Sequence, residues 1–103
     1  MSNIGMKYDD GKLEINLLNF RYLFGIIKIL VFGAKKYKAN SWQKVDNCEV
    51  RYYNALGRHY FAMQREDGSI DLNAVDEESG MPHLWHLQCN GYFLEKFRQD
   101  VEK

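Results

Sequence analysis

The fold is decided near the end of the chain, by the stretch Pro82-His83-Leu84-Trp85-His86-Leu87-Gln88-Cys89-Asn90-Gly91-Tyr92-Phe93-Leu94. Its apolar residues return every three or four positions, which is the period of an amphipathic helix. Proline is favoured in the first turn of a helix, where an N–H would have no partner. We therefore predict a helix over residues 82–101 with Pro82 in its first turn. One stripe of that helix would carry Leu84, Leu87, Gly91, Leu94 and Phe97 or Arg98.

Two further helices are predicted towards the N-terminus. Residues 17–36 carry a wide apolar face of side chains three, four or seven positions apart: Leu18, Leu23, Ile26, Ile27, Leu30 and Val31. The other helix is predicted over residues 48–64, with Asp46 as its N-cap and Glu49 three residues later. Gly57 in its middle disfavours the helix by about 1 kcal/mol relative to alanine. We interpret this glycine as a place where another backbone packs closely.

Polar segments connect the predicted helices. Residues 65–81 form a long acidic loop, which has room for a short hairpin over residues 69–72. Residues 6–16 form a short N-terminal arm or strand. The sequence thus predicts one all-α domain of three helices over residues 1–103. Three helices bury a limited area, so we expect a homo-oligomer to complete the core.

Composition indicates the general class of protein. The 103 residues include 14 Lys+Arg and 14 Asp+Glu, and this charge balance argues against binding to polymeric nucleic acid. No apolar run reaches the roughly 20 residues of a membrane span, and the N-terminus lacks the pattern of a signal peptide. Cys48 and Cys89 lie far apart and form no CxxC pair. We expect a cytoplasmic protein with reduced thiols and no membrane partner.

The three histidines are the residues with the clearest chemistry. His83 and His86 lie one turn apart on the last predicted helix, a spacing that suits two ligands of one metal. Asn90 continues that face. His59 lies on the preceding helix, and packing of the two helices would bring it to the same place. The alternative is that these histidines are hydrogen-bonded core residues or exposed polar ones.

An acidic run, Asp76-Glu77-Glu78, comes just before the last predicted helix. Clustered carboxylates suit Mg²⁺ or Mn²⁺, which in turn neutralise phosphate oxygens, and the histidines allow another divalent metal as well. The alternative is a solvated cluster that the helix dipole favours by itself. The candidate metal ligands are His59, Asp76, Glu77, Glu78, His83 and His86.

Cations and aromatic rings gather around the end of the first predicted helix. Such a mixture suits a nucleotide, because cations bind phosphates and rings stack on a base. The alternative is a solvated helix end with a tucked-in tryptophan. Motifs of the P-loop, the Rossmann fold and the nucleophile elbow do not occur in the sequence. The candidate nucleotide-binding residues are Lys35, Lys36, Tyr37, Trp42, Arg58 and Asn90.

Several short blocks occur in an order that resembles a phage and prophage family. They include Lys7-Tyr8-Asp9-Asp10-Gly11-Lys12, Phe32-Gly33-Ala34-Lys35-Lys36-Tyr37, Asn40-Ser41-Trp42, Arg58-His59, Glu78-Ser79-Gly80-Met81-Pro82-His83-Leu84 and Cys89-Asn90. Over residues 7–95 the chain resembles the dATP/dGTP diphosphohydrolase N-terminal family, grouped with the all-α, MazG-like nucleoside triphosphate pyrophosphohydrolases.

The resemblance implies an oligomeric, helical domain that cleaves a purine deoxynucleoside triphosphate to the monophosphate and pyrophosphate with Mg²⁺ or Mn²⁺. A phage-encoded protein would act in the host cytoplasm. Candidate catalytic roles, as metal ligands or in orienting water, accordingly fall to Glu78, His83 and His86.

The chain also departs from the MazG-like pattern, in which ExxE and ExxD on successive helices bind the metal. No ExxE is present over residues 48–64, and His83-xx-His86 occupies the place of ExxD. The alternative function is a non-catalytic protein that sequesters a nucleotide or a nucleotide-derived signal against host defence. A histidine-based phosphohydrolase of HD type is a third interpretation, although the chain has no adjacent His-Asp pair.

Overall fold

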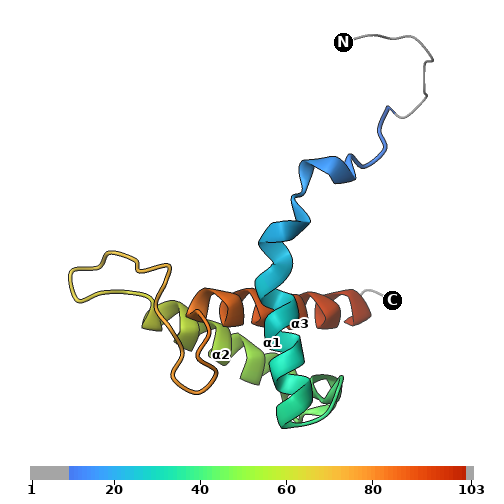
Figure 1. The fold of residues 1–103 in the computed structure, drawn as a ribbon. Helices are drawn as coiled ribbons and strands as arrows, with labels where there is room; N and C mark the ends of the chain where they lie inside the picture. Colours follow the sequence, from blue (N-terminus) through green and yellow to red (C-terminus); the bar gives the residue numbers. More distant parts are fainter. Residues whose placement is uncertain (1–9, 102–103) are drawn as a thin grey trace, which may run out of the picture.

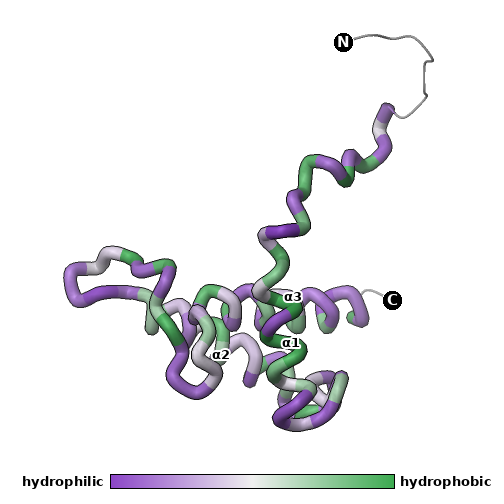
Figure 2. Tube along the Cα trace, viewed as in Figure 1, coloured by the Kyte–Doolittle hydropathy of each residue, from purple (hydrophilic) through white to green (hydrophobic). Residues whose placement is uncertain are grey.

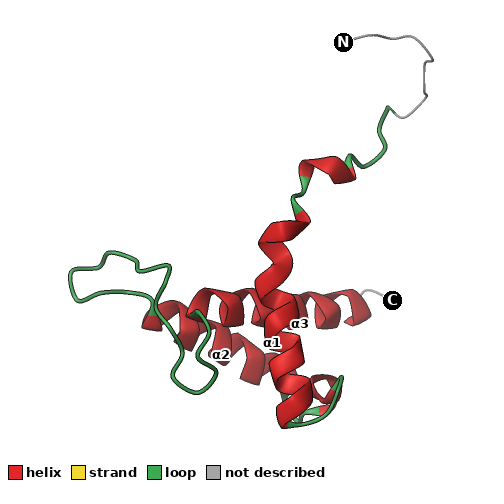
Figure 3. Ribbon diagram, viewed as in Figure 1, coloured by secondary structure: helices red, strands yellow, loops and turns green. Residues whose placement is uncertain are grey.

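The structure is a computed structural model, and it describes residues 10–101 (Figure 3). Three α-helices form its body: α1 Phe24–Lys36, α2 Cys48–Ala62 and α3 His83–Val101. Three short 3-10 turns accompany them: η1 Ile15–Leu17, η2 Phe20–Leu23 and η3 Ser41–Lys44. Within the described residues there are two isolated β-bridges and no strand, so the predicted all-α class is confirmed.

The long α2 and α3 pack side by side with opposite chain directions, and α1 crosses α3 (Figure 1). The crossing is close at Gly25, because a Cβ placed there would lie 2.3 Å from the indole ring of Trp85. Gly25 is itself buried. The predicted close approach at Gly57 is wrong, since a Cβ at that position would meet no atom within 4 Å. The tight contact belongs to α1 and not to α2.

An aromatic cluster holds the η3 turn against α2 and α3. The Trp42 ring stacks on Phe93 with centroids 4.2 Å apart, and it meets Phe97 edge-on at 5.8 Å. The Tyr52 hydroxyl donates a 2.8 Å hydrogen bond to the Trp42 carbonyl oxygen. Large rings that contact one another in this way stabilise the packing beyond the area that they bury.

The N-terminal boundary differs from the prediction. The helix expected from residue 17 begins at Phe24, and the preceding turn η2 is of the 3-10 type. The side chain of Asn19 accepts a hydrogen bond from the Arg21 N–H, and this local bond competes with regular helix geometry. Residues 10–16 of the predicted arm contain a turn and the start of η1 and no strand. Residues 6–9 of that arm lie outside the described residues.

The boundaries of α2 and α3 also shift by one or two residues. Asp46 is not the N-cap of α2; the cap is Asn47, with a positive φ of 54° and no side-chain capping bond. Asparagine is one of the few residues that tolerate this left-handed geometry. Pro82 precedes α3 and pairs with Val75 in a β-bridge, so it lies just outside the first turn. Helix α3 extends as far as Val101, the last residue that the structure describes, as predicted.

The acidic loop, residues 65–81, forms two ordered turns between α2 and α3 (Figure 1). One turn is closed by the bridge of Gln64 with Ile70, which replaces the hairpin predicted over 69–72 and ends α2 two residues early. The other is closed by the bridge of Val75 with Pro82. Gly80 stands at φ 72° in the second turn, where its lack of a side chain avoids strain. The two bridges therefore hold the loop in a defined conformation next to α3.

No helix in residues 10–101 combines the length and the apolar character that crossing a membrane would demand.

Candidate functional site

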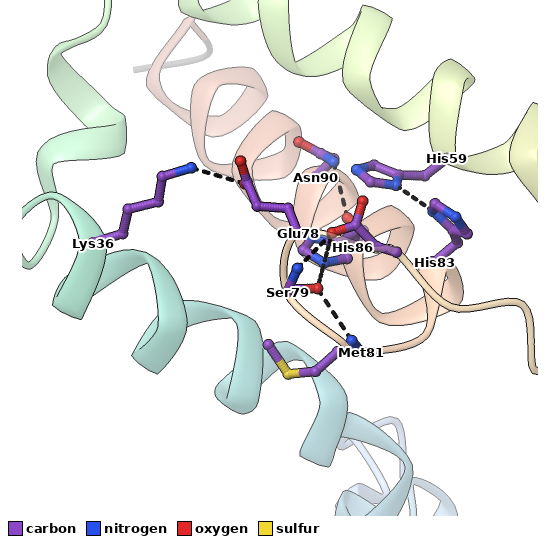
Figure 4. A network of polar contacts seen from close by, with 9 residues as sticks. Lys36, His59, Glu78, Ser79, Met81, His83, His86 and Asn90 are labelled. Carbon is purple, nitrogen blue, oxygen red and sulfur yellow. Dashed lines mark hydrogen bonds and ion pairs between the residues drawn. The ribbon is translucent and has the colours of Figure 1, made fainter.

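The three histidines meet at the α2–α3 contact, beside the acidic loop (Figure 4). The Nδ1 atoms of His59 and His83 lie 2.8 Å apart, a hydrogen-bonding distance. The rings of His59 and His86 stack with centroids 4.6 Å apart and an angle of 10°. His83 and His86 reach the cluster because they are three residues apart on one helix. The predicted convergence of the histidines is therefore found in the structure.

Asp76 brings a carboxylate from the loop to the same cluster. One ligand atom from each of His59, Asp76 and His83 lies within 4.8 Å of the others. The carboxylate is fixed by the Ser79 N–H, which donates to Oδ2 at 2.9 Å. The same Oδ2 lies 3.7 Å from Nε2 of His86. Two imidazoles and one carboxylate are a donor set that divalent transition metals and Zn²⁺ accept.

Burial sets the protonation state of these groups. Burial, together with the neighbouring His86 and His83 rings, lowers the pKa of His59 to about 4. Burial also lowers the pKa of His86, against the opposing pull of the Asp76 carboxylate. For Asp76, burial alone would raise the pKa, but the hydrogen bond from Ser79 and the nearby histidines lower it. At pH 7 His59 and His86 are therefore neutral and Asp76 is ionised, as metal binding requires.

Ser79 is the member of the site that sequence reasoning did not select. Its Oγ lies 2.7 Å from Nε2 of His86 and accepts a hydrogen bond from the Met81 N–H at 3.2 Å. This contact holds the imidazole beside the hydroxyl group, whichever nitrogen of His86 carries the proton. The serine thereby orients His86, and its backbone N–H orients Asp76. The spacing Asp76-x-x-Ser79 beside Gly80 was the available signal, since these residue types favour such turns.

The other two acidic candidates lie at the solvent-exposed edge of the loop. Glu78 forms an ion pair of 2.8 Å with the Lys36 ammonium, which joins the end of α1 to the loop (Figure 4). The hydrogen bond to Glu78 raises the pKa of Lys36. Glu77 is exposed and lies outside the group of three ligands named above. The structure thus brings Asp76 to the histidines and directs Glu78 to a cation.

The six candidate nucleotide-binding residues lie in different places. Lys35 and Tyr37 are exposed at the end of α1, where the Lys36 ammonium lies 5.1 Å from the centre of the Tyr37 ring. Trp42 packs in the aromatic cluster described above. Arg58 lies on α2, in an open groove whose lining includes Tyr53 and Phe61. Asn90 is buried and donates to the His86 carbonyl oxygen at 2.9 Å. Of the six, Lys36 and Asn90 are the ones that contact residues of the histidine cluster or its loop.

Almost the whole chain matches a known protein family. Residues 2–103 match the family described as dATP/dGTP diphosphohydrolase, N-terminal. The chain belongs to this dATP/dGTP diphosphohydrolase N-terminal family. A protein named dATP/dGTP diphosphohydrolase, from Salmonella phage PMBT28, is 29% identical over 92 residues, which cover 87% of this chain. The chain spans 28% of the length of that relative. No solved structure matches.

The part of the chain that matches the family includes every element of the site. The matched residues include α2, the acidic loop and α3, and therefore all three histidines together with Asp76 and Ser79. A divalent metal fits the residues present, because the donor set contains two imidazoles, of which His59 is held neutral by burial, and a carboxylate held by its loop. His59, Asp76 and His83 are the residues whose ligand atoms converge.

Proposed function

We propose that this chain is a metal-dependent nucleotide hydrolase, which cleaves a purine deoxynucleoside triphosphate to the monophosphate and pyrophosphate. The proposal is carried by one observation: the cluster of His59, Asp76 and His83 lies inside a chain of the dATP/dGTP diphosphohydrolase N-terminal family. The nucleotide is inferred from the family and from the name of the Salmonella phage relative. The metal is inferred from the donor set.

The three converging side chains would hold the ion. A bound divalent ion would offset negative charge on the phosphates and make water more acidic. Asp76 keeps its charge for this role because Ser79 holds it, and His59 keeps a lone pair because burial keeps its ring neutral. Glu77 and Glu78, at the edge of the same loop, are proposed as further carboxylates near the phosphates.

His86 is proposed as the general base. Its ring is neutral at pH 7 and is fixed between His59, Ser79 and Asp76, so it can accept a proton in one orientation. The oxygen of a water molecule would attack the α-phosphorus while one of its protons passes to His86. The bond from that phosphorus to the bridging oxygen breaks, and the electron pair leaves with pyrophosphate. His83, beside it on α3, is proposed to act through the metal.

The cations at the end of α1 are proposed to bind the phosphates. Lys36 already contacts a carboxylate of the acidic loop, so an incoming phosphate oxygen could take the place of Glu78. Lys35 and Tyr37 extend this surface, and Asn90 supports His86 from the next turn of α3. Trp42 is proposed for the base and Arg58 for a phosphate, as residues outside the histidine cluster.

The test is product analysis with the purified chain. Each of the four deoxynucleoside triphosphates is incubated with Mn²⁺ or Mg²⁺, and monophosphate and pyrophosphate are quantified. We expect turnover of the purine nucleotides, its loss in His86→Gln, and no change in Glu95→Gln, which alters an exposed carboxylate farther along α3. Absence of turnover with every metal would overturn the proposal. Tight nucleotide binding by calorimetry in that case would support the sequestering protein instead.

A further inference from the structure

The solvent-facing side of α2 carries a groove with a volume of about 650 Å³. Its lining consists of Tyr53, Asn54, Leu56, Gly57, Arg58 and Phe61. We name these six residues the α2 groove. Tyr53, Gly57 and Phe61 are four residues apart, so they follow one another along one face of the helix. The glycine leaves a gap between the two rings, whose Cα atoms are about 12 Å apart along the helix axis.

The α2 groove is separate from the histidine cluster. Successive residues of a helix are rotated by about 100°, so Gly57 and His59 point in directions about 160° apart. His59 contacts His83 of α3 on one side of α2. On the other side, the side chains of Tyr53 and Phe61 are 67% and 75% exposed. A ligand in the groove would therefore lie across the helix from the candidate metal ligands.

The aromatic and polar side chains of the α2 groove are without partners in the part of the chain that the structure describes. There, no hydrogen bond, ion pair or ring contact is made by the side chains of Tyr53, Asn54, Arg58 and Phe61. Tyr52, the neighbour on the inner side of α2, is by contrast fixed in the aromatic cluster. The groove therefore offers two rings, one amide and one guanidinium to a ligand.

These groups match the parts of a nucleotide. Aromatic rings stack on a base, and an asparagine amide can form two hydrogen bonds with the edge of adenine. A guanidinium binds a phosphate through two parallel hydrogen bonds. Arg51 lies seven residues before Arg58, on the same edge of the helix, and adds positive charge there. The volume of the groove lies within the range of about 300–1,000 Å³ that is usual for small-ligand sites.

The polarity of α2 argues against another helix as the occupant. Figure 2 shows α2 as a mixture of hydrophilic and hydrophobic segments, whereas α1 is largely hydrophobic. None of the six lining residues is a carboxylate, so the groove offers no oxygen ligands of the kind that Mg²⁺ prefers. A triphosphate is usually accompanied by such an ion, whereas a monophosphate needs only the guanidinium.

We propose that the α2 groove binds a purine nucleoside monophosphate. The base lies over Gly57 between the two rings, Asn54 pairs with its edge, and Arg58 binds the phosphate. The phosphate assigned to Arg58 above then belongs to this second nucleotide and not to one held at the metal site. The groove does not depend on the proposed hydrolysis, although that reaction would release a ligand of this class.

Calorimetric titration of the full chain with dAMP in the presence of a chelator tests the site, because no metal is needed there. We expect saturable binding of one dAMP per chain. Deoxyadenosine alone and inorganic phosphate alone should each bind at least about tenfold more weakly, since each makes only part of the contacts. His83→Gln changes the histidine cluster across the helix and should keep the dAMP affinity. Absence of dAMP binding, or its loss in His83→Gln, would overturn the proposal.

Substitution of Gly57 tests the place of binding. A Cβ there would meet no atom within 4 Å, so Gly57→Leu should fold, while its side chain fills the gap between the rings. We expect Gly57→Leu and Arg58→Gln each to lose about tenfold or more in dAMP affinity. Gly33→Ala, at an equally open glycine of α1, is the control and should lose none. Circular dichroism would verify that the helices persist.

Two results with Gly57→Leu would overturn the proposal. One is an unchanged dAMP affinity in a folded variant. The other is an unchanged affinity together with a changed sedimentation coefficient, which would make this face of α2 an interface between copies of the chain.

Discussion

The Nδ1 atoms of His59 and His83 lie 2.8 Å apart across the contact between α2 and α3. One nitrogen must donate and the other accept, so the geometry excludes a state in which both carry a proton. Histidine binds a metal through the lone pair of a ring nitrogen. A carboxylate oxygen of Asp76 lies within 4.8 Å of a ring nitrogen of each of these two histidines. For an ion to bind at both Nδ1 atoms, the proton between them would have to leave.

Divalent metal is expected to stabilise the folded chain through this group. A ligand at one hundred times its dissociation constant stabilises a protein by about 2.7 kcal/mol, which for a domain of this size raises the melting temperature by about 10 °C or more. Thermal unfolding at increasing Mn²⁺, Co²⁺ or Zn²⁺ measures the effect. The His59→Ala/His83→Ala variant should lose the metal-dependent rise, whatever its own melting temperature, and Glu95→Gln should keep it. Equal rises in all three proteins would contradict the assignment.

The buried histidines should also make stability depend on pH. The pKa of His59 is about 4 in the folded protein and near 6.5 when the chain is unfolded, and the pKa of His86 shifts in the same direction. Between these values the unfolded chain binds more protons, so the free energy of unfolding should be constant above pH 6.5 and fall as the pH drops towards 4. The carboxyl group of Glu95 has a pKa lowered to about 2, so its own contribution to stability is lost mostly below this pH range.

Urea unfolding in the presence of a chelator measures this pH dependence. The His59→Gln variant, which cannot be protonated at this position, should show a shallower loss between pH 6.5 and 4.5. The charged and titratable groups that influence the pKa of His59 are His86, His83, Asp76 and Arg58, and all of them remain in the variant. A wild type whose unfolding free energy stays flat or rises over this interval would show that His59 is not buried in its neutral form.

The helices and the histidine cluster could be predicted because local patterns determine both. Apolar periodicity locates the bodies of α1, α2 and α3, and a spacing of three residues places His83 and His86 on one face. His59 follows once α2 and α3 are neighbours, which a connecting loop between successive helices favours. Asp76 could be chosen as a candidate ligand because it belongs to the acidic run 76–78 in the loop before α3. The roles of these residues, in contrast, remain predictions.

Features that depend on tertiary contacts could not be predicted. A tryptophan beside lysines suits a nucleotide base and an aromatic core equally well, and only the packing of η3 shows that Trp42 stacks on Phe93. The predicted helices contain several glycines of similar appearance, among them Gly25 and Gly57, and the close contact falls at Gly25 because α1 crosses α3 there. The 3-10 turn before α1 contains a hydrogen bond from the Arg21 N–H to the Asn19 side chain. The spacing of apolar residues gives no information about such a bond.

The glycines of α1 should respond oppositely to the same substitution. A Cβ at Gly25 would lie 2.3 Å from the Trp85 ring, so Gly25→Ala must displace that ring and should destabilise the fold by about 1–3 kcal/mol. Gly33→Ala adds a Cβ that meets nothing within 4 Å, and should stabilise the helix by up to about 1 kcal/mol. Chemical denaturation of both variants measures the difference. Equal effects would mean that α1 does not cross α3 at Gly25.

The two thiols should differ strongly in reactivity. Cys89 is 1% exposed, and burial raises its pKa to about 12, so almost none of it is thiolate at pH 8. Cys48, at the start of α2, is partly exposed. Titration of the native chain with an aromatic disulfide at pH 8 should therefore modify Cys48 first, and Cys48→Ser should leave almost no rapid reaction. Unfolding in urea should then release the second thiol. Rapid labelling of Cys89 in the native protein would instead show that this side of α3 is open to solvent, against its burial in the structure.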